Sequence, residues 1–284
     1  MIHFVGAGPG APDLITRRGA ALLQAADCII YAGSLVNPAL LGLAREDCAV
    51  YNSAEMTLEQ VLAVMRQMEA AGRTTVRLHT GDPCLYGAIR EQMDVLDAEG
   101  IRYDDTPGVS SFCGAAAALN AEYTLPTVSQ TVIITRMEGR TPVPEKEKLA
   151  GLAAHGATMV IFLSIGLVEK VQQALLAGGA YTPDTPAAVV YKATWPEERT
   201  VRCTVGTLAE AFMQRASPKR RSSWWVTFWA GTTSAASCTT RPLPPSSAGG
   251  QTSDPGLPCL YGKGPCAGGK AGRRISRQRG PLRP

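Results

Sequence analysis

The segment Gly6-Ala7-Gly8-Pro9-Gly10 has the residue types of a ligand-binding turn, because it carries almost no side chains and would let a bulky molecule approach the backbone. It nearly matches the glycine fingerprint of dinucleotide-binding proteins. Such a site also needs an acidic residue after the second strand to hold the ribose hydroxyls. Here the apolar run 28–31 is followed by Ala-Gly-Ser, and Pro9 removes an N–H that could contact phosphate. The loop therefore predicts a close-approach turn, and a dinucleotide site is excluded.

Two further stretches place polar groups at helix starts. Residues 79–87 leave a strand and put Gly81 and the Asp82 carboxylate ahead of a helix. Residues 106–112 put two hydroxyls, those of Ser110 and Ser111, at the start of a small-residue helix. Asp and Ser at such positions either cap the helix or face a ligand, and spacing alone does not decide between these roles.

Alternating elements position these stretches. Short apolar runs predict buried parallel strands at 2–5, 28–31, 48–51 and 74–79. Thr57-Leu58-Glu59-Gln60 is a capping box that opens a helix over 61–71, and another helix is expected over 88–99. This βαβα order predicts an α/β fold with a parallel sheet covered on both faces.

The sequence pattern changes near residue 124, where a second series of predicted strands and helices begins. Strands are expected at 131–135, 159–163, 187–191 and 200–205, with helices at about 145–154, 167–177 and 207–214. We therefore expect two α/β domains, 1–123 and 124–214, with an interdomain cleft. Residues 215–284 form an irregular, basic tail rich in Pro, Gly and Ser, for which we expect disorder.

Charge divides the chain at the same point. Residues 1–214 carry 16 Lys and Arg against 23 Asp and Glu, whereas residues 215–284 carry 12 against one. The eight cysteines form no C-x-x-C pair, so we expect free buried thiols and no metal site. No apolar run is long enough to span a bilayer, and we expect a cytoplasmic protein with no membrane partner.

Taken in order, the three stretches resemble those of the tetrapyrrole (precorrin) methyltransferase family, and the resemblance covers roughly residues 1–214. The family's G-x-G-P-G, G-D-P-x-x-Y-G and P-G-[TV]-[ST]-[SA] motifs are all present. Within the family, the segments 31–36, 129–136, 140–144 and 161–164 look like the branch that acts on precorrin-4.

The resemblance implies methyl transfer from S-adenosylmethionine to C11 of precorrin-4 or cobalt-precorrin-4, in cobalamin biosynthesis. It also implies a homodimer. The residues it assigns to the cofactor are Pro9, Gly81, Asp82, Leu85, Tyr86, Ser110, Ser111, Leu163 and Ala193. Those it assigns to the tetrapyrrole substrate are Gly6, Gly8, Gly10, Ser34 and Arg136.

Cationic side chains such as Arg136 or Arg77 could pair with substrate carboxylates, although each is also readable as a surface charge. No catalytic base can be named; Glu91 is a candidate whose alternative is a salt bridge on the helix surface.

Two alternative functions remain open. One is a sibling methyltransferase that acts on uroporphyrinogen III or another corrin carbon. The other is nucleic-acid binding through the basic tail, which would weaken steeply with salt. Since the patterned region is acidic, we expect no nucleic-acid partner for it.

The tail also has the signature of a shifted reading frame. Tryptophan has one codon, so bases straddling Trp224 and Trp225 spell Val, and the following triplets spell or permit Gly-Asp-x-Leu-Gly. That is how the family's late strand should continue. We therefore expect residues from about 215 onward to be frameshifted, the second domain to lose a late strand and the dimer to be weakened.

Overall fold

The computed structural model of the chain describes residues 1–139, 142–164, 167–215 and 225–230, all of them within one compact unit, Met1–Thr239. The strands are β1 (Ile2–Gly6), β2 (Cys28–Tyr31), β3 (Ala49–Asn52), β4 (Thr75–His79), β5 (Tyr103–Thr106), β6 (Val132–Arg136), β7 (Thr158–Ser164), β8 (Pro186–Tyr191), β9 (Arg199–Thr204) and β10 (Trp225–Ala230). The α-helices are α1 (Arg17–Ala25), α2 (Leu58–Ala70), α3 (Arg90–Ala98), α4 (Ser111–Leu119), α5 (Leu149–Ala153), α6 (Val168–Ala177) and α7 (Leu208–Arg215). Short 3-10 helices cover Pro12–Leu14, Gly33–Leu35, Pro38–Leu43, Ser53–Glu55 and Glu145–Glu147.

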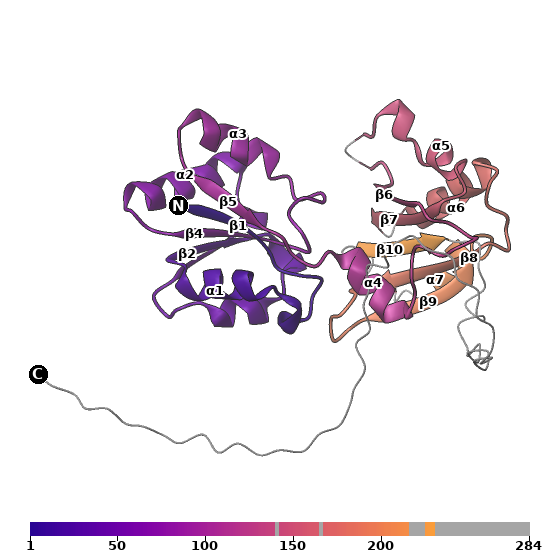
Figure 1. Cartoon of the computed structure of the whole chain (residues 1–284), viewed down its shortest axis with the longest axis horizontal. Helices are drawn as coiled ribbons and strands as arrows, with labels where there is room; N and C mark the ends of the chain where they lie inside the picture. Colours follow the sequence, from indigo (N-terminus) through magenta and orange to yellow (C-terminus); the bar gives the residue numbers. More distant parts are fainter. Residues whose placement is uncertain (140–141, 165–166, 216–224, 231–284) are drawn as a thin grey trace, which may run out of the picture. The chain divides into compact units, whose positions relative to one another are not determined.

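The first sheet is parallel, with the order β3-β2-β4-β1-β5. Figure 1 shows α1 on one face and α2 and α3 on the other. Strands β1 and β2 present apolar residues to both faces, and all five residues of β4, Arg77 and His79 included, are buried, so helices cover the sheet on both sides. The expected strands and the covered parallel sheet are confirmed.

The capping box at Thr57 is formed as expected. The Thr57 hydroxyl accepts the backbone N–H of Gln60 at 3.3 Å, and the Gln60 side chain accepts the backbone N–H of Thr57 at 2.8 Å. These two bonds satisfy donors that the first turn of α2 leaves unpaired. They fix the start of a helix that buries Val61, Leu62 and Met65.

The second sheet is mixed, with the order β6-β7-β10-β8-β9. Strands β6 and β7 are parallel, whereas β10 runs antiparallel to both of its neighbours and β8 runs antiparallel to β9. Strand β10 (Figure 1) corrects the expectation of an irregular tail from residue 215, and the sheet does not lose its late strand. The run Trp-Val-Thr-Phe-Trp-Ala is rich in aromatic and β-branched residues, which favour strands. The tail segments 216–224 and 231–284 lie outside the described residues.

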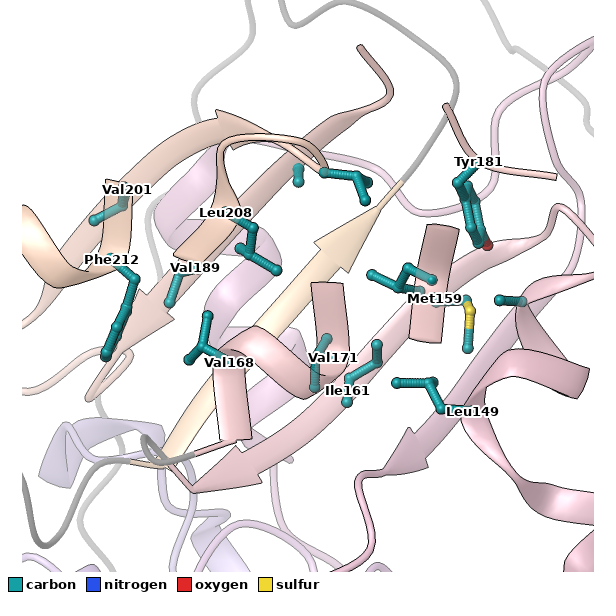
Figure 2. Packing of buried hydrophobic residues seen from close by; sticks show 14 of the residues in the cluster. Leu149, Met159, Ile161, Val168, Val171, Tyr181, Val189, Val201, Leu208 and Phe212 are labelled. Carbon is teal, nitrogen blue, oxygen red and sulfur yellow. The ribbon is translucent and has the colours of Figure 1, made fainter. Parts of the chain in front are cut away.

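The core of the second half lies between this sheet and helices α5, α6 and α7. Figure 2 shows Met159 and Ile161 of β7 and Val189 of β8 facing Val171 of α6 and Leu208 of α7. These strand residues occupy alternate positions, so their side chains point to the same face of the sheet.

Helix α4 packs on the other face of the second sheet. Ala115 and Leu119 of α4 form a buried cluster with Ala188 and Val190 of β8 and with Ala193. The expected boundary at residue 123 would have assigned α4 to the first domain. In the structure this helix packs with the strands of the second sheet.

Candidate functional site

The three motif stretches, 6–10, 79–87 and 106–112, meet beyond the carboxyl ends of β1, β4 and β5, which are adjacent strands. Their backbones touch at three glycines. A Cβ atom added to Gly108 would lie 2.1 Å from the Gly81 carbonyl oxygen and 2.7 Å from the Gly6 Cα. Only glycine allows this approach, so the three motifs form one junction at the sheet edge where α/β proteins bind ligands.

Asp82 ties two of the loops together. One carboxylate oxygen accepts the backbone N–H of Cys84 at 2.8 Å, and the other accepts the backbone N–H of Gly108 at 3.0 Å. The first bond closes a local turn, because residues 83–86 form a turn and α3 begins only at Arg90, so the expected helix start directly after Asp82 is wrong. The second joins the loop after β4 to the loop after β5. Asp82 thus organises the junction through its backbone partners.

The segment after Asp82 has an unusual backbone. Tyr86 and Ala88 have φ values of 58° and 50°, in the left-handed region that side chains disfavour. The Tyr86 ring is 49% exposed and makes an edge contact with Phe162 of β7, with ring centroids 5.5 Å apart. Burial raises the pKa of Tyr86, and the Arg136 charge opposes this shift. Residues from the two sheets, Tyr86 and Arg136, are therefore near each other.

Ser110 precedes α4 but does not cap it. The residue is 7% exposed, and its side chain makes no capping hydrogen bond to the helix. Gly81 lies against it, since an added Cβ would be 3.5 Å from the Ser110 Cα. The Ser110 hydroxyl therefore remains available at the junction, next to the partly buried Ser111.

Pro9 and Ala193 are brought together by α4. A Cβ on Gly114 would lie 2.9 Å from the Pro9 Cβ, 3.2 Å from the Thr194 Cγ2 and 3.3 Å from the Ala193 Cβ. The glycine loop and the turn after β8 thus meet over one small residue, as the sequence assignment of Pro9 and Ala193 to one site requires.

Backbone polar groups of the glycine loop are hydrogen-bonded to neighbouring segments of the protein. The backbone N–H groups of Ala7 and Gly8 donate to the carbonyls of His79 and Gly81, and the Gly10 carbonyl accepts the Asn37 side chain at 2.8 Å. A loop that cradles phosphate would point such N–H groups at the ligand. The loop is therefore a packed platform, consistent with the exclusion of a dinucleotide site.

Several sequence assignments differ from the structure or are not resolved by it. Arg77 is 7% exposed, and its guanidinium donates to the Gln92 side chain and the Ile30 carbonyl, so its reading as a substrate contact is wrong. Arg136 donates to the Pro142 carbonyl at 2.9 Å. The structure does not describe the Leu163 side chain. Ser34 is exposed, three residues before Asn37.

The described part of the chain contains five of the eight cysteines, all with free thiols. Cys84 and Cys113 are exposed, which corrects the expectation that the thiols are buried. Within the described ranges, no group of three His, Cys, Asp or Glu side chains could hold a metal ion. No helix in this part of the chain is both long and apolar enough to cross a membrane.

The sequence model of the tetrapyrrole (corrin/porphyrin) methylases matches residues 1–209. The chain belongs to the tetrapyrrole methylase family. It is 54% identical to a cobalt-precorrin-4 C(11)-methyltransferase of Methanocaldococcus jannaschii over 209 residues, which cover 74% of this chain and 80% of that protein. A relative of the same name from Priestia megaterium is 47% identical, over 81% of this chain and 88% of that protein. The crystal structure of a cobalt precorrin-4 methyltransferase superimposes with a TM-score of 0.76 at 46% identity, covering 81% of this chain and 93% of that one.

Two side chains near the motif loops of this tetrapyrrole methylase were not expected from the sequence. Trp195 donates its indole N–H to the Pro9 carbonyl at 3.1 Å. The Gln92 side chain accepts a hydrogen bond from the Arg77 guanidinium and donates one to the Ala88 carbonyl. Only the position of Trp195, two residues after Ala193, could have drawn attention to it.

Proposed function

We propose that this tetrapyrrole methylase transfers the methyl group of S-adenosylmethionine to C11 of precorrin-4 or cobalt-precorrin-4, in cobalamin biosynthesis. The observation that carries the proposal is the junction of the three motif loops. Relatives that share at least 47% of their residues with this chain over most of their length carry the corresponding activity in their names.

The residues at the junction suit a ligand with both polar and flat apolar parts. The Ser110 hydroxyl lacks an internal capping partner, the Tyr86 ring is half exposed, and Gly81 permits close approach. We assign the cofactor to Pro9, Gly81, Asp82, Leu85, Tyr86, Ser110, Ser111, Leu163 and Ala193. We assign the macrocycle to the glycine loop, Ser34 and Arg136.

In this reaction the main task of the protein is to position the methyl donor and the acceptor. The bound sulfonium cofactor supplies an already activated methyl group. The chain must hold donor and acceptor in line and keep water out, which can account for a large part of a rate enhancement. A junction fixed by Asp82 and by backbone contacts between glycines gives the rigidity that such alignment needs. The Arg136 guanidinium would pair with a substrate carboxylate.

The test is an acceptor panel. The protein is incubated with S-adenosylmethionine and, separately, with precorrin-4, cobalt-precorrin-4 and uroporphyrinogen III, and each product is analysed by mass spectrometry. We expect one added methyl group on a precorrin-4 acceptor and none on uroporphyrinogen III. Methylation of uroporphyrinogen III alone would replace this proposal with the sibling activity.

A further inference from the structure

The turn after β8 is bonded to the glycine loop at consecutive residues. The Trp195 indole N–H donates to the Pro9 carbonyl at 3.1 Å, and the Ala11 backbone N–H donates to the Thr194 hydroxyl at 2.9 Å. These residues are more than 180 positions apart in the chain. In each bond the partner in the glycine loop is a backbone group, so the bonds fix the position of the loop backbone itself.

The Trp195 ring also fills the space beside Gly10. A Cβ atom added to Gly10 would lie 2.1 Å from the ring Cδ1 and 2.3 Å from the Nε1. The φ of Gly10 is 158°, near extended backbone, so the glycine is required here by the ring. The loop and the indole thus fit each other sterically as well as through hydrogen bonds.

The turn is itself held in a costly conformation. Lys192 and Thr194 have φ values of 47° and 68°, which side chains disfavour. Glu198 accepts the Thr194 backbone N–H at 2.6 Å, and the Lys192 ammonium lies 4.6 Å from the centroid of the Trp195 ring. These contacts stabilise the shape in which Thr194 and Trp195 face the loop.

We propose that Trp195, together with Thr194, is a positioning residue that fixes the Pro9–Ala11 segment for methyl transfer. This inference rests on the proposed function, because it names how that site is held. Trp195 is only partly buried and acts through the loop backbone. Its loss would leave the Asp82 junction intact while the loop shifts, and displacements of about 1 Å can cost about a hundredfold in rate.

The variant Trp195→Phe keeps an aromatic side chain and removes the indole N–H together with part of the ring system. We expect kcat for methyl transfer to precorrin-4 to fall about tenfold or more, with the KM for S-adenosylmethionine changing less than about threefold. Thr194→Val, which removes the hydroxyl acceptor, should behave likewise, and Thr194→Ser should restore the rate. Tyr181→Phe is the matched control, since the Tyr181 hydroxyl donates to the Ala157 carbonyl away from the loop. It should leave kcat unchanged.

Hydrogen exchange of the 7–14 segment provides a readout that needs no activity. We expect the Ala11 amide to exchange faster in Trp195→Phe and Thr194→Val than in the wild type, and at the wild-type rate in Tyr181→Phe. Unchanged exchange together with unchanged kcat in folded Trp195→Phe would overturn the inference. If the wild type methylates no precorrin-4 acceptor, the proposed function fails, whereas the exchange experiment still decides whether Trp195 fixes the loop.

Discussion

At the scale of single residues, Asp82 links the loops after β4 and β5 through two backbone N–H groups. We expect Asp82→Ala to weaken S-adenosylmethionine binding at least tenfold and to cost about 1–3 kcal/mol of stability, because two backbone N–H groups lose their acceptor. Calorimetric titration measures the first effect and urea unfolding the second. Cofactor affinity equal to wild type in the folded variant would remove Asp82 from the site.

For Tyr86→Ala, in the same loop, we expect a loss of cofactor affinity without the loss of stability expected for Asp82→Ala. The ring is half exposed and contacts only Phe162 among the aromatic side chains of the described residues. Its loss should therefore weaken cofactor binding with little change in the unfolding free energy. A large loss of stability with normal affinity would mean that Tyr86 serves packing.

His79 predicts a pH dependence of stability. Its Nε2 is buried with no hydrogen-bond partner in the described structure, and burial together with the Arg77 charge lowers the pKa of His79 to about 3 from 6.5. The unfolded chain therefore takes up a proton below its pKa of 6.5, while the folded chain does not. The free energy of unfolding should fall as pH decreases from 6.5 toward 3 and be insensitive to His79 above 6.5.

His79→Phe tests this assignment, because it keeps a ring beside Phe4 and removes the titrating nitrogen. Urea unfolding at roughly pH 4.5 and pH 7.5 should show a smaller difference between the two pH values in the variant than in the wild type. An equal difference in both proteins would show that His79 does not contribute to the acid sensitivity.

Some site residues could be predicted from sequence and others could not. Asp82 and Ser110 follow strand-like runs, so their place at a sheet edge is readable from the pattern. Arg77 was misread because a charge usually marks a surface, yet both faces of β4 are covered. Trp195 binds a loop far away in sequence, and no local pattern encodes that contact.

At the scale of elements, the glycine junction predicts a sharp steric effect. Gly108→Ala would put a methyl group 2.1 Å from the Gly81 carbonyl oxygen, where backbone must move. We expect a loss of about 3 kcal/mol or more in the free energy of unfolding. Gly42→Ala is the control, because no atom lies within 4 Å of its added Cβ, and it should stay within about 0.5 kcal/mol of wild type. Equal stabilities in chemical denaturation would contradict the junction.

Most elements were predictable because each has one dominant pattern. The apolar runs of β1 and β2 and the capping box of α2 specify the ends of these elements locally. Strand β5, with the sequence Tyr-Asp-Asp-Thr, was missed because it is an edge strand with exposed acidic residues. Strand β10 was missed because it lies within a segment whose composition is that of a disordered tail.

At the scale of the whole molecule, the family resemblance stops before the chain does. The family match ends at residue 209, and the Methanocaldococcus jannaschii relative is covered over 80% of its length. We predict that sequencing the encoding DNA will show an insertion or deletion near codons 214–222 whose correction restores Val-Gly-Asp-x-Leu-Gly. DNA in which no single-base change restores this ending would refute the prediction.

A corrected reading frame should also change assembly. Family resemblance implies a homodimer built partly from the second domain. We therefore predict that the chain as given dimerises weakly and the frame-corrected chain dimerises stably. Light scattering at low micromolar protein concentration compares the two, and a stable dimer of the uncorrected chain would contradict a role for the altered ending.

The most direct test of the central claim follows one methyl group. The protein is incubated with precorrin-4 or cobalt-precorrin-4 and S-adenosylmethionine carrying a carbon-13 methyl, and the product is examined by NMR. The proposed function predicts a single labelled methyl bonded to C11 and a stoichiometric yield of S-adenosylhomocysteine. Label at another ring carbon, or no transfer by folded protein that binds the cofactor, would contradict it.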